Sequence, residues 1–273
     1  MAVYMKKIKT GKNLVFLLLL LIVGTIGCAV SEEEKSLMLL FEDDFEGDTL
    51  DDSKWERCPE WERGGGMDLW DEDMSYLDGE GLLILRAEWD EENGRVLSGA
   101  VRTYNHFSAG FGYYEASIRF PVAKGIWGAF WMMVGAVGNV DGTSIDGVEI
   151  DIIESISNES GRSNHALHWD GYEADAKSAS KTHTNLDIYD GEFHTFALWR
   201  TEESYIFYVD GQETWRSEGG GICAEDGYMK LTVEAAAWAG AGSSRSIQAL
   251  PAQMEVDYVR VWDTNPYITE DVE

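Results

Sequence analysis

Residues 193–215, FHTFALWRTEESYIFYVDGQETW, carry the clearest local structural signal in the chain. The runs Tyr205-IFYV and Gln212-ETW contain the aromatic and β-branched side chains that favour strands. Between them, Asp210-Gly211 supplies the positive φ angles of a tight two-residue turn. The stretch therefore predicts a β-hairpin, in which two antiparallel strands are joined by one turn.

The same pattern extends outward over residues 39–262. Short β-rich runs are separated by Gly, Asp and Asn, and no long segment has a helical period. The clearest further runs are residues 81–90, 113–121, 129–136, 148–157 and 254–263. Many antiparallel strands with 29 Gly and only 4 Pro predict an all-β domain of two stacked sheets, because a parallel α/β fold would need intervening helices.

The first 27 residues have the build of a secretory signal, with lysines before an apolar run at residues 14–23. That run is too short to cross a hydrocarbon core of roughly 30 Å as a helix. Thr25-Ile26-Gly27-Cys28 resembles a bacterial lipoprotein cleavage box, with Thr25 where Leu is usual. We expect a secreted or cell-surface protein that is lipid-anchored at Cys28, with ordinary cleavage as the alternative.

These signals predict the organisation of the chain. Residues 1–27 are the signal peptide, 28–38 a charged tether, 39–263 a single β domain and 264–273 a C-terminal tail. The sequence shows neither an internal repeat nor a second domain, and we expect a monomer.

The composition restricts the partners of this domain. A formal net charge of −29 would repel nucleic acid and anionic membranes, so we expect no nucleic-acid partner and a membrane contact only through Cys28. A neutral partner fits better, although the acid excess also favours solubility by itself. The 11 Trp and 12 Tyr exceed the needs of a core, which indicates that some rings are exposed for binding.

Cysteine and histidine give no sign of a metal for catalysis. Besides Cys28, only Cys58 and Cys223 are present, and they either form a disulfide or remain two buried thiols. The sequence contains no CxxC or HExxH motif, so we expect no cofactor for catalysis.

Three acids lie among large apolar residues in the stretch 147–155, GVEIDIIES. In a regular strand Glu149 and Asp151 share one face about 6.5 Å apart, whereas Glu154 has the opposite parity. A β-bulge at Ile152-Ile153 would return Glu154 to the face of the other two. A chemical role for all three acids therefore predicts a bulge at this position.

Such a set of carboxyl groups suits glycoside hydrolysis with retention, in which a nucleophile and an acid/base lie about 5–5.5 Å apart. A third carboxylate between them would raise the pKa of a neighbour and help to keep the acid protonated. The alternative is an edge strand whose acids face solvent and discourage aggregation.

The order of the acids resembles the bulged E-x-D-x-x-E signature of glycoside hydrolase family 16, which includes laminarinases, lichenases, agarases and carrageenases. Other stretches resemble further segments of that family in the same order, namely Asp43-DFEGDTLDDSKW, Tyr113-YEASIRFPVAKGIWGAFWMM, Phe193-HTFALW with Tyr208-VDG, and Asp257-YVRVW. The resemblance implies a concanavalin-like β-jelly roll with a concave substrate cleft. It also implies that Glu149 is the nucleophile, Asp151 the assisting carboxylate and Glu154 the general acid and base.

The resemblance implies substrate contacts as well. Trp127 and Trp131 match aromatic residues beside the cleaved bond, and His168, Glu234 and Trp238 lie where the family contributes further cleft residues. The segment around Glu234 departs from the family, which often has Asn and a Gly-Gly pair there.

Arg102 is displaced from the family's usual arginine and is either a substrate contact or a surface residue. Many members also bind a structural calcium ion, for which Asp44, Gly81 and Asp257 match best.

The expected activity is endo-hydrolysis of an uncharged β-glucan, most simply a β-1,3-glucan such as laminarin. Residues 126–157 contain no Lys or Arg that would bind sulfate, while Trp127 and Trp131 offer stacking surfaces. Arg102, Lys124 or Arg162 could nevertheless fold over the cleft. Mixed-linkage glucans, agar and other galactans, mucin glycans and transglycosylation stay open, and the rival of another class is a non-catalytic, lectin-like domain.

Overall fold

The computed structural model describes residues 36–156, 161–237, 239–240 and 249–268. The expected signal peptide, Cys28, most of the tether and Trp238 lie outside the described residues, as does the end of the expected tail. Within the described part of the chain, no helix is long and apolar enough to cross a membrane. The following account concerns the unit Leu37–Glu273.

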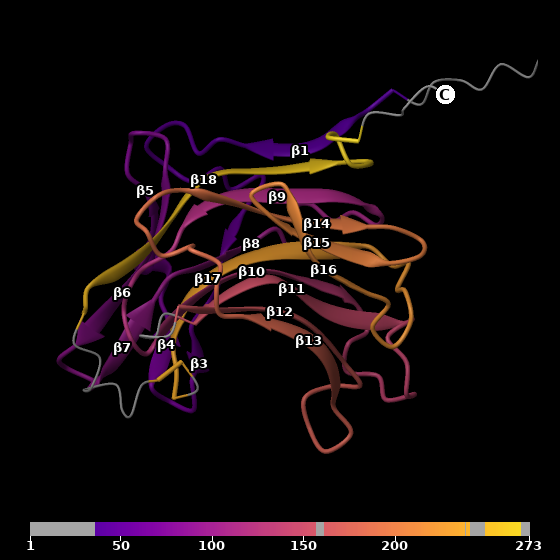
Figure 1. Ribbon diagram of the computed structural model, residues 1–273. Coiled ribbons are helices and arrows are strands. Elements are labelled where there is room, and N and C mark those ends of the chain that lie inside the picture. The colour runs from indigo at the N-terminus through magenta and orange to yellow at the C-terminus, as the bar shows by residue number, and fades with distance from the viewer. Residues whose placement is uncertain (1–35, 157–160, 238, 241–248, 269–273) are drawn as a thin grey trace, which may run out of the picture. The chain divides into compact units, whose positions relative to one another are not determined.

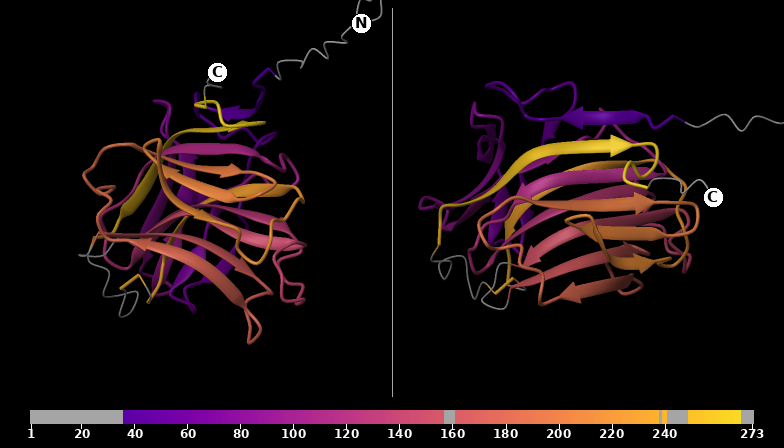
Figure 2. Two further views of the ribbon diagram at one scale, coloured as in Figure 1. Left: turned by 45° about the vertical axis from the view of Figure 1, so that its right-hand side comes forward. Right: turned by 45° about the horizontal axis from the view of Figure 1, so that its top comes forward.

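The described strands form two sheets, which Figures 1 and 2 show as stacked layers. The larger sheet consists of β1 (Leu39–Asp43), β3 (Trp61–Arg63), β4 (Asp68–Trp70), β5 (Ser75–Leu77), β6 (Leu83–Asp90), β7 (Arg95–Ser98), β9 (Gly112–Arg119), β14 (His194–Arg200), β15 (Tyr205–Val209), β16 (Gln212–Ser217) and β18 (Ala252–Trp262). Its main order is β16-β15-β14-β9-β18-β6-β7-β4-β3, with β1 beside β18 and β5 beside β6.

The smaller sheet carries the acids. It consists of β2 (Glu56–Arg57), β8 (Ala100–Arg102), β10 (Ile126–Gly135), β11 (Gly147–Ile156), β12 (Arg162–Trp169), β13 (Lys177–His183) and β17 (Gly227–Ala235). Its order is β13-β12-β11-β10-β17-β8-β2. The predicted all-β, two-sheet architecture is therefore confirmed, with one parallel pair, β4 and β7, among antiparallel neighbours. A short 3-10 helix, η1 (Glu72–Met74), lies before β5.

The predicted hairpin is present. β15 and β16 pair from Val209 and Gln212 outward, and Asp210 and Gly211 have φ angles of 50° and 72°. The positive φ of Asp210 is tolerated because Asp adopts this conformation more readily than most residues, and its carboxylate accepts a hydrogen bond from the Thr195 backbone N–H at 2.9 Å.

The apolar faces of the two sheets pack against each other. The shared core contains Ile118 from β9 and Phe207 from β15, together with Phe130 from β10 and Ile150 from β11, all fully buried. Because inward residues alternate with outward ones along each strand, the other face of the smaller sheet is left free to form a cleft.

Cys58 and Cys223 are both buried free thiols, so the second of the two alternatives for these cysteines holds in the structure. Burial raises the pKa of the Cys58 thiol to about 11, which leaves it protonated and unreactive.

Candidate active site

A β-bulge in β11 places all three acids on one face, as predicted. Opposite β10, Asp151 pairs with Trp131 and Ile153 pairs with Phe130, which leaves Ile152 as the extra residue. The register with β12 shifts at the same point, between Asp151 and Glu154. The bulge turns Ile152 and Ile153 both into the core and returns Glu154 to the cleft.

A buried histidine satisfies the backbone at the bulge. His165 Nδ1 lies 2.5 Å from the carbonyl oxygen of Ile152, and its Nε2 lies 2.9 Å from Thr214 Oγ1 on β16 of the other sheet. Burial lowers the pKa of His165 to about 3, so the ring is neutral. A carbonyl oxygen only accepts hydrogen bonds, so Nδ1 carries the proton and donates a hydrogen bond to the Ile152 carbonyl.

Each of the three acids has its own polar partner. Tyr172 Oη donates to Glu149 Oε2 at 2.6 Å, and Asn164 Nδ2 donates to Glu154 Oε2 at 3.2 Å. His168 Nε2 lies 3.3 Å from Asp151 Oδ2. The sequence did not single out Tyr172 or Asn164, because their contacts depend on a loop conformation and on the register of β12.

The electrostatics of the three acids suit acid/base chemistry. Burial, and then the charge of Asp151, raise the pKa values of both Glu149 and Glu154 above the ordinary range. The hydrogen bond to Asp151 raises the pKa of His168 to about 8, so this imidazole is largely charged at neutral pH. One cation next to three acids permits a protonated Glu154 while another carboxylate stays ionised.

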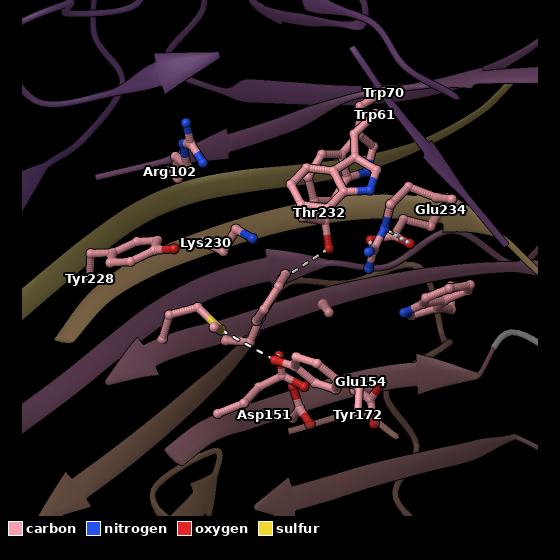
Figure 3. A pocket seen from close by; sticks show the side chains of 16 residues that line it. Trp61, Trp70, Arg102, Asp151, Glu154, Tyr172, Tyr228, Lys230, Thr232 and Glu234 are labelled. Carbon is pink, nitrogen blue, oxygen red and sulfur yellow. Dashed lines mark hydrogen bonds and ion pairs between the residues drawn. The ribbon is translucent and has the colours of Figure 1, made fainter. Parts of the chain in front are cut away.

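The acids line a cleft of about 440 Å³ on the smaller sheet (Figure 3). Trp127 and Trp131 lie in this cleft, as expected, and Trp131 Nε1 donates to Thr232 Oγ1 at 3.2 Å. The other lining residues are Trp61, Arg63, Trp70, Arg102, Ala129, Met133, Glu149, Asp151, Glu154, Tyr172, Tyr228, Lys230, Thr232 and Glu234.

Glu234 reaches the cleft wall, but both of its carboxylate oxygens bind Arg63. Arg63 Nε lies 2.9 Å from Oε2 and Nη2 lies 3.2 Å from Oε1, and the guanidinium group stacks over Trp70 at 4.7 Å. Glu234 therefore holds Arg63 in place, and its predicted contact with substrate stays a prediction. Trp238 was expected beside it and lies outside the described residues.

The stretch 126–157 contributes no Lys or Arg, but other strands bring basic residues into the cleft. Arg63, Arg102 and Lys230 reach the cleft from β3, β8 and β17, because an antiparallel sheet brings together strands that are distant in sequence. Arg102 is thus a cleft residue, and its Nε binds Glu56 at 2.7 Å. Figure 3 shows Arg102 and Lys230 on the side of the cleft away from Asp151 and Glu154.

Lys230 differs from the two arginines, because no hydrogen bond or ion pair to a carboxylate is found for it among the described residues. It is only 7% exposed, and its Nζ lies 3.9 Å from the ring centre of Trp131 and 5.1 Å from that of Trp70. Burial lowers its pKa to about 8, which still leaves it mostly charged at neutral pH.

The residues expected to hold calcium fit the ion only in part. Asp44 Oδ1 accepts a hydrogen bond from Arg260 Nη2 at 2.8 Å, so a cation would compete with this guanidinium group. Asp257 is exposed at a register shift in β18, and Gly81 could offer only its carbonyl oxygen. Among the described residues, the acid and histidine group close enough to hold an ion is Glu149, Asp151 and His168. The structural calcium stays a prediction.

Comparisons with known proteins show which proteins this chain resembles. The model of the β-porphyranase A–D family, GH16 domain, matches residues 37–264. Glucan endo-1,3-beta-glucosidase A1 of Niallia circulans is 23% identical in an alignment 271 positions long, which covers 87% of this chain and 39% of that protein. Keratan-sulfate endo-1,4-beta-galactosidase of Sphingobacterium multivorum is 27% identical in an alignment 239 positions long, which covers 82% of this chain and 54% of that protein.

A solved structure confirms the fold. The mixed linkage glucan GH16 protein of Bacteroides ovatus, in complex with a G4G4G3G product, superposes with a TM-score of 0.69 at 24% identity. The match covers 81% of this chain and 99% of that one. The two sheets described above are therefore the two layers of the predicted β-jelly roll.

Proposed function

This chain belongs to glycoside hydrolase family 16, and we propose that it is a retaining endo-β-glycosidase whose substrate is a β-linked galactan that carries anionic groups. The cations of the cleft, Lys230 above all, are the observation that carries the choice of substrate.

The three acids supply the reaction. Glu149 attacks the anomeric carbon while Glu154 donates its proton to the leaving oxygen, which gives a covalent glycosyl-enzyme. Glu154, now ionised, then takes a proton from water as that water attacks the anomeric carbon and releases Glu149. Asp151 lies between them and repels a second negative charge, which supports the protonated state of Glu154.

Lys230 supports an anionic substrate because of what surrounds it. Arg63 and Arg102 already bind carboxylates, whereas the Lys230 ammonium group is buried against two tryptophan rings. A buried ammonium group without an anion is costly, and a sulfate ester or carboxylate of a bound glycan would compensate it.

The position of Lys230 places charge recognition beside Trp131. Trp131 pairs with Asp151 on one side and with Lys230 on the other, so the backbone of Lys230 lies two strands, about 9.5 Å, from that of Asp151. The Lys230 side chain reaches over the intervening strand, with Nζ 3.9 Å from the ring centre of Trp131, so an anionic group that binds it would lie beside that ring. The net charge of −29 opposes the approach of a polyanion, so the cations of the cleft must offset a repulsion that salt screens beyond about 8 Å at physiological ionic strength.

Similar proteins favour the same class, since the matching family model is that of β-porphyranases and one relative is a keratan-sulfate endo-1,4-beta-galactosidase. The second candidate is the β-1,3-glucan that the sequence favours, because Trp61, Trp70, Trp127 and Trp131 would also stack on neutral rings, and one relative is a glucan endo-1,3-glucosidase.

The test is a comparison of kcat/KM on porphyran, keratan sulfate, neutral agarose and laminarin for the parent and for Lys230→Met. We expect the parent to prefer a sulfated polymer, with a preference that weakens as salt is raised. Lys230→Met should lose roughly tenfold or more on that polymer and little on neutral ones. Lys181→Met, an exposed lysine on β13, is the matched control.

Two results would overturn this substrate. If the parent prefers laminarin, the substrate is the β-1,3-glucan instead. If Lys230→Met loses the same activity on charged and on neutral polymers, the ammonium group does not recognise the anionic groups of the substrate.

A further inference from the structure

The phenol of Tyr172 lies on the proposed nucleophile although it comes from a different part of the chain. Tyr172 follows β12, whereas Glu149 lies near the start of β11. Its hydroxyl donates to Glu149 Oε2 at 2.6 Å and lies 3.7 Å from the sulfur of Met133. The side chain is otherwise open to solvent, with 60% of the residue exposed, and Figure 3 shows it beside Asp151 and Glu154.

The loop that carries this exposed ring has a buried anchor. Asp170 is 2% exposed, and its carboxylate accepts from the backbone N–H groups of Asp141 and Gly142 at 3.2 and 3.1 Å. Lys177 Nζ lies 2.9 Å from the same carboxylate. The structure therefore ties the Tyr172 loop to the loop that leads into β11.

The backbone then turns Tyr172 back over the cleft. Asp170 and Gly171 have φ angles of 60° and 76°, and two successive left-handed residues reverse the chain sharply. The Gly171 N–H donates to the Val137 carbonyl at 2.7 Å. The contact with Glu149 is thus built by an ordered loop that is fixed at several points.

We propose that Tyr172 is a positioning residue for the nucleophile, whose hydroxyl holds Glu149 Oε2 and so presents the other oxygen, Oε1, to the anomeric carbon. The inference rests on the proposed function, because it assigns Glu149 the attacking role. A carboxylate with one oxygen bound keeps one rotamer and one free oxygen, which preorganises the attack.

The hydroxyl also bears on ionisation. Donation to a carboxylate stabilises its charged form, which opposes the effect of burial on the pKa of Glu149. Among the described residues, the other titratable or charged groups that face Glu149 are Asp151 and Glu154 on its own strand, His168 on β12, Tyr228 and Lys230 on β17, and Arg63 on β3. A Tyr172→Phe substitution leaves all of these in place, so it isolates the hydroxyl.

The experiment measures kcat, KM and the pH profile of Tyr172→Phe on whichever polymer the parent cleaves. We expect kcat to fall about 10- to 100-fold, the loss of one hydrogen bond to a charged group, while KM changes much less. The acidic limb of the profile should move to higher pH, because Glu149 without its donor binds a proton more readily. Tyr76→Phe, on β5 in the other sheet, should match the parent.

The outcomes separate this inference from the proposed function. If the parent cleaves no glycan, or if Glu149→Gln stays active, the proposed function fails. If Glu149→Gln is inactive but Tyr172→Phe keeps the kcat and pH profile of the parent, only the role of Tyr172 fails. A loss of kcat with an unmoved acidic limb and a lowered thermal midpoint would assign Tyr172 a merely structural role and would overturn the inference as well.

Discussion

Replacing His165 with Leu tests whether the β-bulge depends on this buried ring. The substitution leaves the Ile152 carbonyl without its donor inside the core, which costs about 1–3 kcal/mol. It also removes ring contacts with Phe207 and Trp215, at centroid distances of 5.0 and 6.5 Å, which adds about 0.5–1.5 kcal/mol. Because Leu is of similar size, little cavity results. The free energy of unfolding should therefore fall by roughly 2–4 kcal/mol.

His165→Leu should lower kcat by more than the loss of folded protein accounts for. The bulge sets the position of Glu154 relative to Glu149, and a displacement of about 1 Å can cost on the order of 100-fold in rate. His165→Asn is the informative partner, because its amide nitrogen can replace Nδ1 and still donate to Ile152. His165→Gln instead reaches toward Thr214 and leaves the bulge carbonyl unpaired.

The assay combines urea unfolding with kcat for the three variants and for His106→Leu, an exposed control. We expect His165→Asn to keep more activity than His165→Gln. Stability of the parent should also decline as pH falls from about 6.5 toward 3, since the buried ring has a pKa of about 3 and the unfolded chain takes up the proton first. His165→Leu should lack this part of the decline. If His165→Leu kept the stability and kcat of the parent, the reasoning would be refuted.

Other predictions follow from the acids. Glu149→Gln and Glu154→Gln should each abolish turnover with the unfolding midpoint little changed, and Asp151→Asn should have a milder though substantial effect, as measured by kcat and thermal unfolding; parent-like turnover in the Glu149 variant would remove the assignment. The first product should keep the anomeric configuration of the substrate, because a nucleophile and an acid on one strand face suit the short separation of retaining enzymes; proton NMR of the initial product reads this, and an inverted anomer would contradict it.

The sequence predicts what depends on local order. Asp210-Gly211 predicts its hairpin because the turn geometry is a property of two residues. The bulge at Ile152 is predictable because Asp151 and Glu154 would point to opposite faces of a regular strand. The two acids can share a face only if an extra residue is inserted between them. Strand limits differ from expectation by a few residues, as in β10, which begins at Ile126.

The remaining site residues depend on tertiary register. Lys230 lies in the run YMKLT, which looks like any strand with one charged position, and only its pairing with Trp131 places it in the cleft. Arg63 becomes a cleft residue because Glu234, far along the chain, binds it. Tyr172 depends on the left-handed conformation of Asp170, which no composition rule specifies.

The pairing of the first and last strands bears on how the domain could be rebuilt. β1 lies beside β18, with Leu39 opposite Trp262 (Figure 1). Just beyond them, the Asp263 N–H donates to the Met38 carbonyl and the Met38 N–H donates to Asp263 Oδ1, each at 3.0 Å. A short linker could join these two positions, and new termini could be opened in the exposed turn at residues 91–94 between β6 and β7. The acids depend on the order of strands in space, so a circularly permuted chain that keeps every pairing should retain the catalytic geometry.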